Sequence, residues 1–124
     1  MKEKYIFFTL FLCIFLLVTC GPDQKSQPYS KEFPYLPSYH GQMELIEFED
    51  KGTGEMSIAT YSVPSITGHE FLMEYETLLL KEGWVNTFDN KPVSINMEKE
   101  DHLAIIITPP AKEGENLIVI IYSQ

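Results

Sequence analysis

The sequence predicts an α+β fold, in which an antiparallel sheet of about five to six strands carries one helix packed on one face. Three observations lead to this prediction. One segment has apolar residues at helical spacing, six segments have strand character, and short turn sequences separate most neighbouring strands. The predicted order along the chain is β-β-α-β-β-β-β, and the length of 124 residues leaves room for one such domain.

The first predicted element is a β-hairpin. Residues 43–49 form its first strand, with Ile46 and Phe48 on one face and Leu45 on the other, because strand side chains alternate. Residues 50–54 contain two glycines and predict the hairpin loop. Residues 55–63 form the return strand, which Pro64 ends because proline has no amide hydrogen for the ladder.

A helix is predicted between Thr67 and Gly83. Thr67 and Glu70 have the spacing of a capping box, in which the threonine oxygen accepts from the backbone of the third helical residue. Gly83 is the expected left-handed stop, and in a Schellman ending Trp84 packs back on Leu79. The apolar residues on one side of this helix are Phe71, Leu72, Tyr75, Leu78 and Leu79.

Four further strands are predicted after the helix. They cover residues 84–88, 93–98, 102–108 and 116–122, with turns at Asp89 and Asn90 and at residues 99–101. The last two strands are apolar at nearly every position, so we expect them to lie in the centre of the sheet.

The residues before the hairpin divide into a tether and an aromatic segment. Residues 20–32 are rich in Pro, Gln and Ser and predict a flexible tether, which leaves residues 33–124 as the domain. In residues 33–39, aromatic side chains alternate with prolines, which disfavour a helix. We therefore expect an extended segment laid on the domain.

One helix can cover only one face of the predicted sheet, yet the closing strands have apolar residues on both. Strand parity shows which residues share a face, but not which face meets the helix. We expect residues 33–39 to fold across the second face and leave a groove that binds an envelope protein or an apolar ligand. The alternative is that a partner, a second copy of the chain or a lipidic ligand covers this face. The predicted groove is formed by Phe33, Tyr35, Tyr39, Ile118, Ile120 and Tyr122.

Residues 1–19 predict a signal peptide, with lysines at its start and an apolar stretch of about fifteen residues. This stretch is short for a membrane-spanning helix, which needs ~20 residues. Leu17, Val18, Thr19 and Cys20 resemble the bacterial lipobox, although glycine, alanine or serine is usual at the position of Thr19. The resemblance implies cleavage before Cys20, acylation of Cys20 and anchoring to the membrane. An ordinary signal peptide and an uncleaved anchor are the alternatives.

The implied location is the cell envelope, outside the cytoplasm. Gly21 differs from the aspartate typical of retention at the inner membrane, which favours the outer membrane in a host with two membranes. Cys13 lies within the predicted leader, so Cys20 is the one cysteine of the mature chain and no disulfide within it is expected.

The composition argues against nucleic acid as a partner. The formal net charge is −9, the chain contains no arginine, and the predicted leader removes two lysines and one glutamate. Binding to phosphates needs clustered basic side chains, which this sequence lacks. The same charge disfavours direct docking on anionic lipid.

No pattern of catalytic or metal-binding residues is found. His40, His69 and His102 have no zinc-ligand spacing, and no serine has the G-x-S-x-G context. The acidic clusters at residues 47–50 and 98–101 are interpreted as charged hairpin ends. We expect a non-enzymatic binding or assembly domain without a cofactor or metal. A small periplasmic or surface hydrolase, or a structural subunit of an envelope complex, is the alternative.

A proline-tyrosine opening at residues 36–41, a strand at residues 59–62 and a helix exit at Gly83 and Trp84 together resemble a small domain of uncharacterised bacterial lipoproteins, over the span from Phe33 to Tyr122. The resemblance implies the same α+β fold and a membrane-anchored protein, and it brings no catalytic residues with it. The residues that carry it are Leu36, Pro37, Ser38, Tyr39, His40 and Gly41, then Ala59, Thr60, Tyr61 and Ser62, and finally Tyr75, Gly83, Trp84 and Tyr122.

Overall fold

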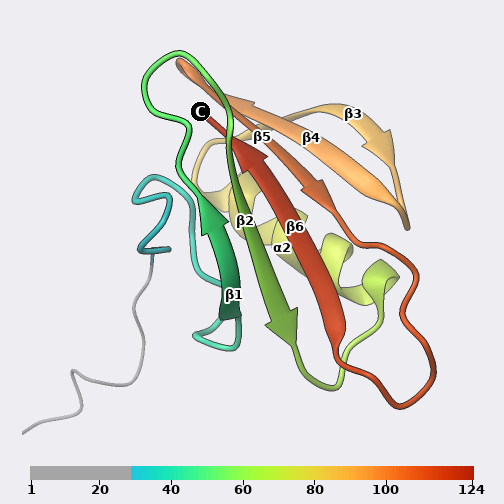
Figure 1. The fold of residues 1–124 in the computed structure, drawn as a ribbon. Helices are drawn as coiled ribbons and strands as arrows, with labels where there is room; N and C mark the ends of the chain where they lie inside the picture. Colours follow the sequence, from blue (N-terminus) through green and yellow to red (C-terminus); the bar gives the residue numbers. More distant parts are fainter. Residues whose placement is uncertain (1–28) are drawn as a thin grey trace, which may run out of the picture.

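The structure of the protein is a computed structural model that describes residues 29–124. The predicted leader, Cys20 and most of the predicted tether lie outside these residues. The described part contains a six-stranded sheet in the order β1-β2-β6-β5-β4-β3, with every neighbouring pair antiparallel, and one helix behind it (Figure 1). This confirms the predicted α+β fold. The elements are β1 (Glu44–Glu49), β2 (Ser57–Val63), α2 (Gly68–Lys81), β3 (Val85–Asn90), β4 (Ser94–Lys99), β5 (His102–Ile107) and β6 (Leu117–Ser123).

The prediction that the two most apolar strands are central is also confirmed. In the observed order, β6 and β5 occupy the two middle positions of the sheet. The turn after the helix differs from the prediction, because β3 continues through Asp89 and Asn90, which pair with Ile95 and Ser94. The turn comes after them, where a carboxylate oxygen of Asp89 accepts from the backbone of Lys91.

Helix α2 begins and ends where the local sequence predicts. The side-chain oxygen of Thr67 accepts from the backbone N–H of Glu70 at 3.2 Å, which confirms the N-cap. At the other end, the N–H of Trp84 donates to the carbonyl of Leu79 at 3.0 Å and Gly83 has φ of +95°. These two features confirm the Schellman ending.

A β-bulge in β1 changes which of its side chains share a face. The register shifts between Leu45 and Glu47, so that Leu45 pairs with Tyr61 and Phe48 pairs with Ala59. Leu45 and Phe48 therefore point to the same side, and the predicted alternation was wrong. The extra residue, Ile46, interrupts the two-residue period of the strand.

The hydrophobic core lies between the sheet and α2. Alternate residues of β2, β4, β5 and β6 point into it and are buried, and the helix contributes Phe71, Leu72, Tyr75 and Leu79. The sheet contributes Ala59, Tyr61, Val63, Ile95, Met97, Ala104, Ile106, Leu117, Val119 and Ile121.

The N-terminal segment, residues 29–43, packs on the same face of the sheet as α2. Leu36 has no exposed surface, the hydroxyl of Tyr75 donates to the carbonyl of Pro37 at 2.7 Å, and the ring of Tyr39 lies 5.0 Å from that of Phe71. The prediction that residues 33–39 cross the second face was therefore wrong.

The physical reason is the width of the helix. Among the strands, α2 lies nearest to β3 and β4. A helix is about 10–12 Å across, whereas six strands at ~4.8 Å spacing are about 24 Å wide. The helix thus leaves part of its own face uncovered, and the N-terminal segment fills that part.

Candidate functional site

The face of the sheet that points away from α2 is apolar in its centre and is called the open face below. In β6, Ile118, Ile120 and Tyr122 alternate with buried residues and point to this side. Each of the central apolar side chains is partly exposed, and no other part of the described chain lies in front of β6 (Figure 1). The apolar residues of the open face on β2, β5 and β6 are Ile58, Leu103, Ile105, Ile107, Ile118, Ile120 and Tyr122.

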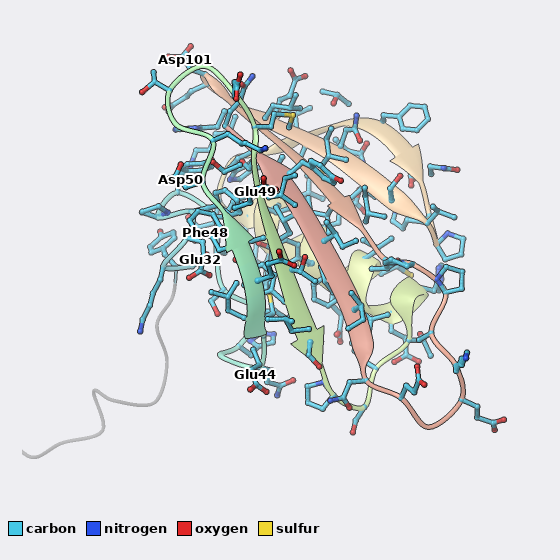
Figure 2. The ribbon with its side chains drawn as sticks, in the orientation of Figure 1. Glu32, Glu44, Phe48, Glu49, Asp50 and Asp101 are labelled. Atoms are coloured by element: carbon cyan, nitrogen blue, oxygen red, sulfur yellow. The ribbon has the colours of Figure 1, made fainter. Side chains whose placement is uncertain are left out.

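One margin of the open face is acidic. Because of the bulge, Glu44, Glu47 and Glu49 pair with Ser62, Thr60 and Ile58, and all three carboxylates point to the open face. Figure 2 shows Glu44 and Glu49 at the two ends of β1. The Nζ atom of Lys51 lies 2.8 Å from Oε1 of Glu49, and the hydrogen bond to this carboxylate raises the pKa of the lysine.

The other margin is formed by β3 and β4. Val85 and Phe88 of β3 are 61% and 56% exposed, and their partners on β4 are Glu98 and Asn96. Glu98 is exposed and is paired on its other side with Leu103. The apolar centre is therefore bordered by three carboxylates on the β1 side and by one carboxylate, that of Glu98, on the other side.

The structure does not bring the six residues of the predicted groove together. Ile118, Ile120 and Tyr122 share the open face, as parity predicted. Phe33, Tyr35 and Tyr39 lie on the opposite face, because the N-terminal segment fills the space beside α2. The groove prediction was wrong, and the candidate surface is the open face itself.

Two aromatic residues of the predicted groove, Tyr35 and Tyr39, have structural contacts instead. Tyr35 stacks on His102 with ring centroids 3.7 Å apart, and its hydroxyl lies 2.8 Å from that of Ser123. Tyr39 donates to a carboxylate oxygen of Glu74. Burial, followed by the hydrogen bond to Glu74, raises the pKa of Tyr39 to about 12. Both tyrosines thus act as neutral hydrogen-bonding groups at neutral pH.

The remaining residues with predicted structural roles lie in and around the helix. Tyr75 is fully buried, and this burial raises the pKa of its hydroxyl. Leu79 and Trp84 are in the core, while Thr67, Glu70 and Gly83 mark the ends of the helix. None of them points to the open face.

A shallow hollow of about 500 Å³ lies between the N-terminal segment and the β1–β2 hairpin, and the hydroxyl groups of its two serines are hydrogen-bonded. Ser57 donates to Asp50 at 3.3 Å, and Ser123 donates to the carbonyl of Leu103 at 2.7 Å. The nearby His102 has its Nδ1 3.1 Å from the carbonyl of Gln124. Among residues 29–124, no serine is hydrogen-bonded to a histidine, the nucleophile–base pair that many serine hydrolases use.

The three histidines are at separate places in the structure. His40 has φ of +48° and is exposed before β1, His69 is exposed in the first turn of α2, and His102 begins β5. In the part of the chain that the structure describes, no three His, Cys, Asp or Glu residues come together in a group that could hold a metal ion. The turn between β4 and β5 carries Glu100 and Asp101, and it lies at the same end of the sheet as the β1–β2 hairpin (Figure 2).

Comparison with known proteins gives no match to a family model, a curated protein or a solved structure. Within residues 29–124, no helix combines the length and the apolar composition that a membrane span requires. The geometry of the open face therefore carries the functional argument.

The acidic margin does not follow from regular strand alternation. Regular alternation places Glu47 and Glu49 on one face and Glu44 on the other, whereas the bulge unites them. The spacing of the three glutamates, three residues and then two, was the available signal for a bulge.

Proposed function

We propose that this chain is a lipid-anchored lipoprotein of the bacterial envelope, and that its domain binds a partner through the open face without catalysis. The observation that carries the proposal is the partly exposed apolar centre of the sheet, formed by β2, β5 and β6. Apolar side chains left in water forgo about 1.5–3 kcal/mol each when fully exposed, and large apolar patches usually mark interaction sites.

The lipid anchor is supported by the leader and by the resemblance of residues 17–20 to a lipobox. Eight residues separate Cys20 from Tyr29, where the described domain begins. A fully extended chain spans at most ~3.6 Å per residue, so over nine residue steps Tyr29 can lie no more than about 32 Å from an acylated Cys20. The expected partner is therefore a component at or near the same membrane.

The proposal can be tested by crosslinking in the producing cell. A photoreactive amino acid replaces Ile120 on the open face, and in a matched variant it replaces Leu80, which is 51% exposed on α2. We expect discrete crosslinked species from position 120 and none from position 80. The same pattern from both positions, or no species from either, would contradict a docking role for the open face.

A fatty-acid label tests the anchor in the same cells. We expect the wild-type chain to be labelled and Cys20→Ala to be unlabelled and released from the membrane fraction. If the alanine variant is labelled as strongly as the wild type, the anchor is not at Cys20.

A further inference from the structure

We infer that the partner of the open face is a basic amphipathic helix, with Lys or Arg on both sides of its apolar stripe. This inference rests on the proposed docking role and names the chemistry of the partner. It follows from the charges at the margins of the open face, from its dimensions and from the poor fit of the other possible occupants.

The charges on the open face have one sign. The strand residues that point to it include four carboxylates, those of Glu44, Glu47, Glu49 and Glu98, and no lysine. Glu49 is paired with Lys51 at 2.8 Å. Within residues 29–124, Glu44, Glu47 and Glu98 have no lysine within ion-pair distance. A complementary surface therefore needs an apolar centre with cations on both sides.

The dimensions fit one helix. Between β1 and β4 there are four strand spacings, which amount to about 19 Å. A helix is about 10–12 Å across. Lying over β6 and β5, it would leave gaps of a few ångströms on each side, which Lys or Arg side chains can span. Since β6 has 7 residues, at ~3.4 Å each, the surface is about 24 Å long and matches a helix of about 15 residues.

A second copy of this chain fits the charges less well. If two open faces stack with their β1 strands together, Glu44 and Glu47 meet the same carboxylates of the other copy. If β1 instead meets β3 of the other copy, the glutamates face Val85 and Phe88 and are desolvated without a cation. An anionic membrane surface is repelled by the same carboxylates. A basic partner is the occupant whose charges these margins attract.

The test uses the whole chain in phosphatidylcholine nanodiscs and a fluorescent synthetic peptide. The peptide is a 15-residue amphipathic helix of leucine and lysine, and a matched peptide has glutamate in place of every lysine. Binding is followed by fluorescence anisotropy, with the signal from empty nanodiscs subtracted. We expect the lysine peptide to bind, its affinity to fall as salt is raised, and the glutamate peptide not to bind.

Three chain variants locate the binding. In the first, Glu44→Gln, Glu47→Gln and Glu49→Gln remove the charges of the β1 margin. Exposed ion pairs are weak, so we expect the lysine peptide to lose about threefold to thirtyfold in affinity. The control, Glu100→Gln with Glu113→Gln and Glu115→Gln, removes the same charge elsewhere and should change the affinity less than twofold. Ile120→Asn should abolish binding, and emission of the buried Trp84 verifies that each variant is folded.

The outcomes separate this inference from the proposed function. Equal binding of the two peptides, or equal effects of the two triple variants, would contradict the basic partner and leave an apolar docking surface in place. No binding of either peptide would also contradict it, while crosslinking at position 120 decides the docking role independently. Self-association of the chain that Ile120→Asn abolishes would identify a second copy as the occupant and overturn the inference.

Discussion

At the scale of single residues, Trp84 joins the end of α2 to the N-terminal segment. Its backbone N–H closes the end of α2, its ring is 2% exposed, and that ring stacks on Tyr35 of the N-terminal segment at 6.2 Å. The Nε1 atom of Trp84 has no hydrogen-bond partner in the described part of the chain. The side chain of Trp84 therefore stabilises the domain by packing and not by a hydrogen bond.

Replacing this side chain should be costly. Trp84→Ala is expected to lower the free energy of unfolding by about 3–5 kcal/mol, as truncation of a core aromatic does. The control Leu80→Ala removes a side chain that is 51% exposed, and its expected cost is below about 1 kcal/mol. Urea unfolding followed by circular dichroism measures both values. Similar losses in the two variants would contradict the core position of Trp84.

The helix exit could be predicted residue by residue because its determinants are local. Gly83 tolerates a left-handed backbone, and the next residue in a Schellman ending returns to the helix. The bulge at Ile46 could not be found in the same way. A bulge forms where one strand has an extra residue relative to its neighbour. The register of β1 therefore depends on its pairing with β2 as well as on its own sequence.

At the scale of elements, the N-terminal segment acts as a second cover beside α2. Its conformation is fixed by turns, in which the N–H of Leu36 donates to the carbonyl of Phe33 at 2.9 Å. Ser30 and Glu32 already contact the hydroxyl of Tyr61, so these contacts begin before residue 33. The aromatic composition of this segment predicted that it contacts the domain. The face of the sheet on which it packs depends on how much of that face the helix leaves uncovered.

The hydrogen bond from Tyr75 to Pro37 should hold this segment on the helix. Tyr75→Phe removes the hydroxyl and leaves the carbonyl of Pro37 buried without this donor. We expect a loss of about 1–3 kcal/mol in the free energy of unfolding, together with faster hydrogen exchange at the amide of Leu36. The control is Tyr122→Phe, which removes a hydroxyl from the open face. It should change neither the free energy of unfolding nor the hydrogen exchange at the amide of Leu36. Unchanged exchange at Leu36 in Tyr75→Phe would show that the segment is held by packing alone.

At the scale of the whole molecule, the two faces of the sheet differ in what covers them. Parity along β5 and β6 predicted which residues lie together, and that part of the candidate surface is correct. The identity of the covered face could not be predicted, because β6 is apolar at every position from Leu117 to Ile121 and both sides are suitable for a core. The covered face is the one on which α2 and the N-terminal segment pack.

Two adjacent isoleucines of β6 test this division. Ile121 is 1% exposed and points to α2, whereas Ile120 is partly exposed on the open face. Ile121→Ala should lower the free energy of unfolding by about 2–5 kcal/mol, because it leaves a cavity in the core. Ile120→Ala removes the same atoms from a half-covered surface, where less apolar area is buried, and should cost about 1 kcal/mol.

Binding should respond in the opposite order. Ile120→Ala should weaken capture of the leucine–lysine peptide, while Ile121→Ala should leave its affinity unchanged under conditions where the variant is folded. A residue that matters more for binding than for stability belongs to a docking surface, because its apolar contacts form only when the partner covers it. Equal destabilisation by the two substitutions would mean that the open face is already covered in the isolated protein, and a face that is covered in this way cannot receive the helix.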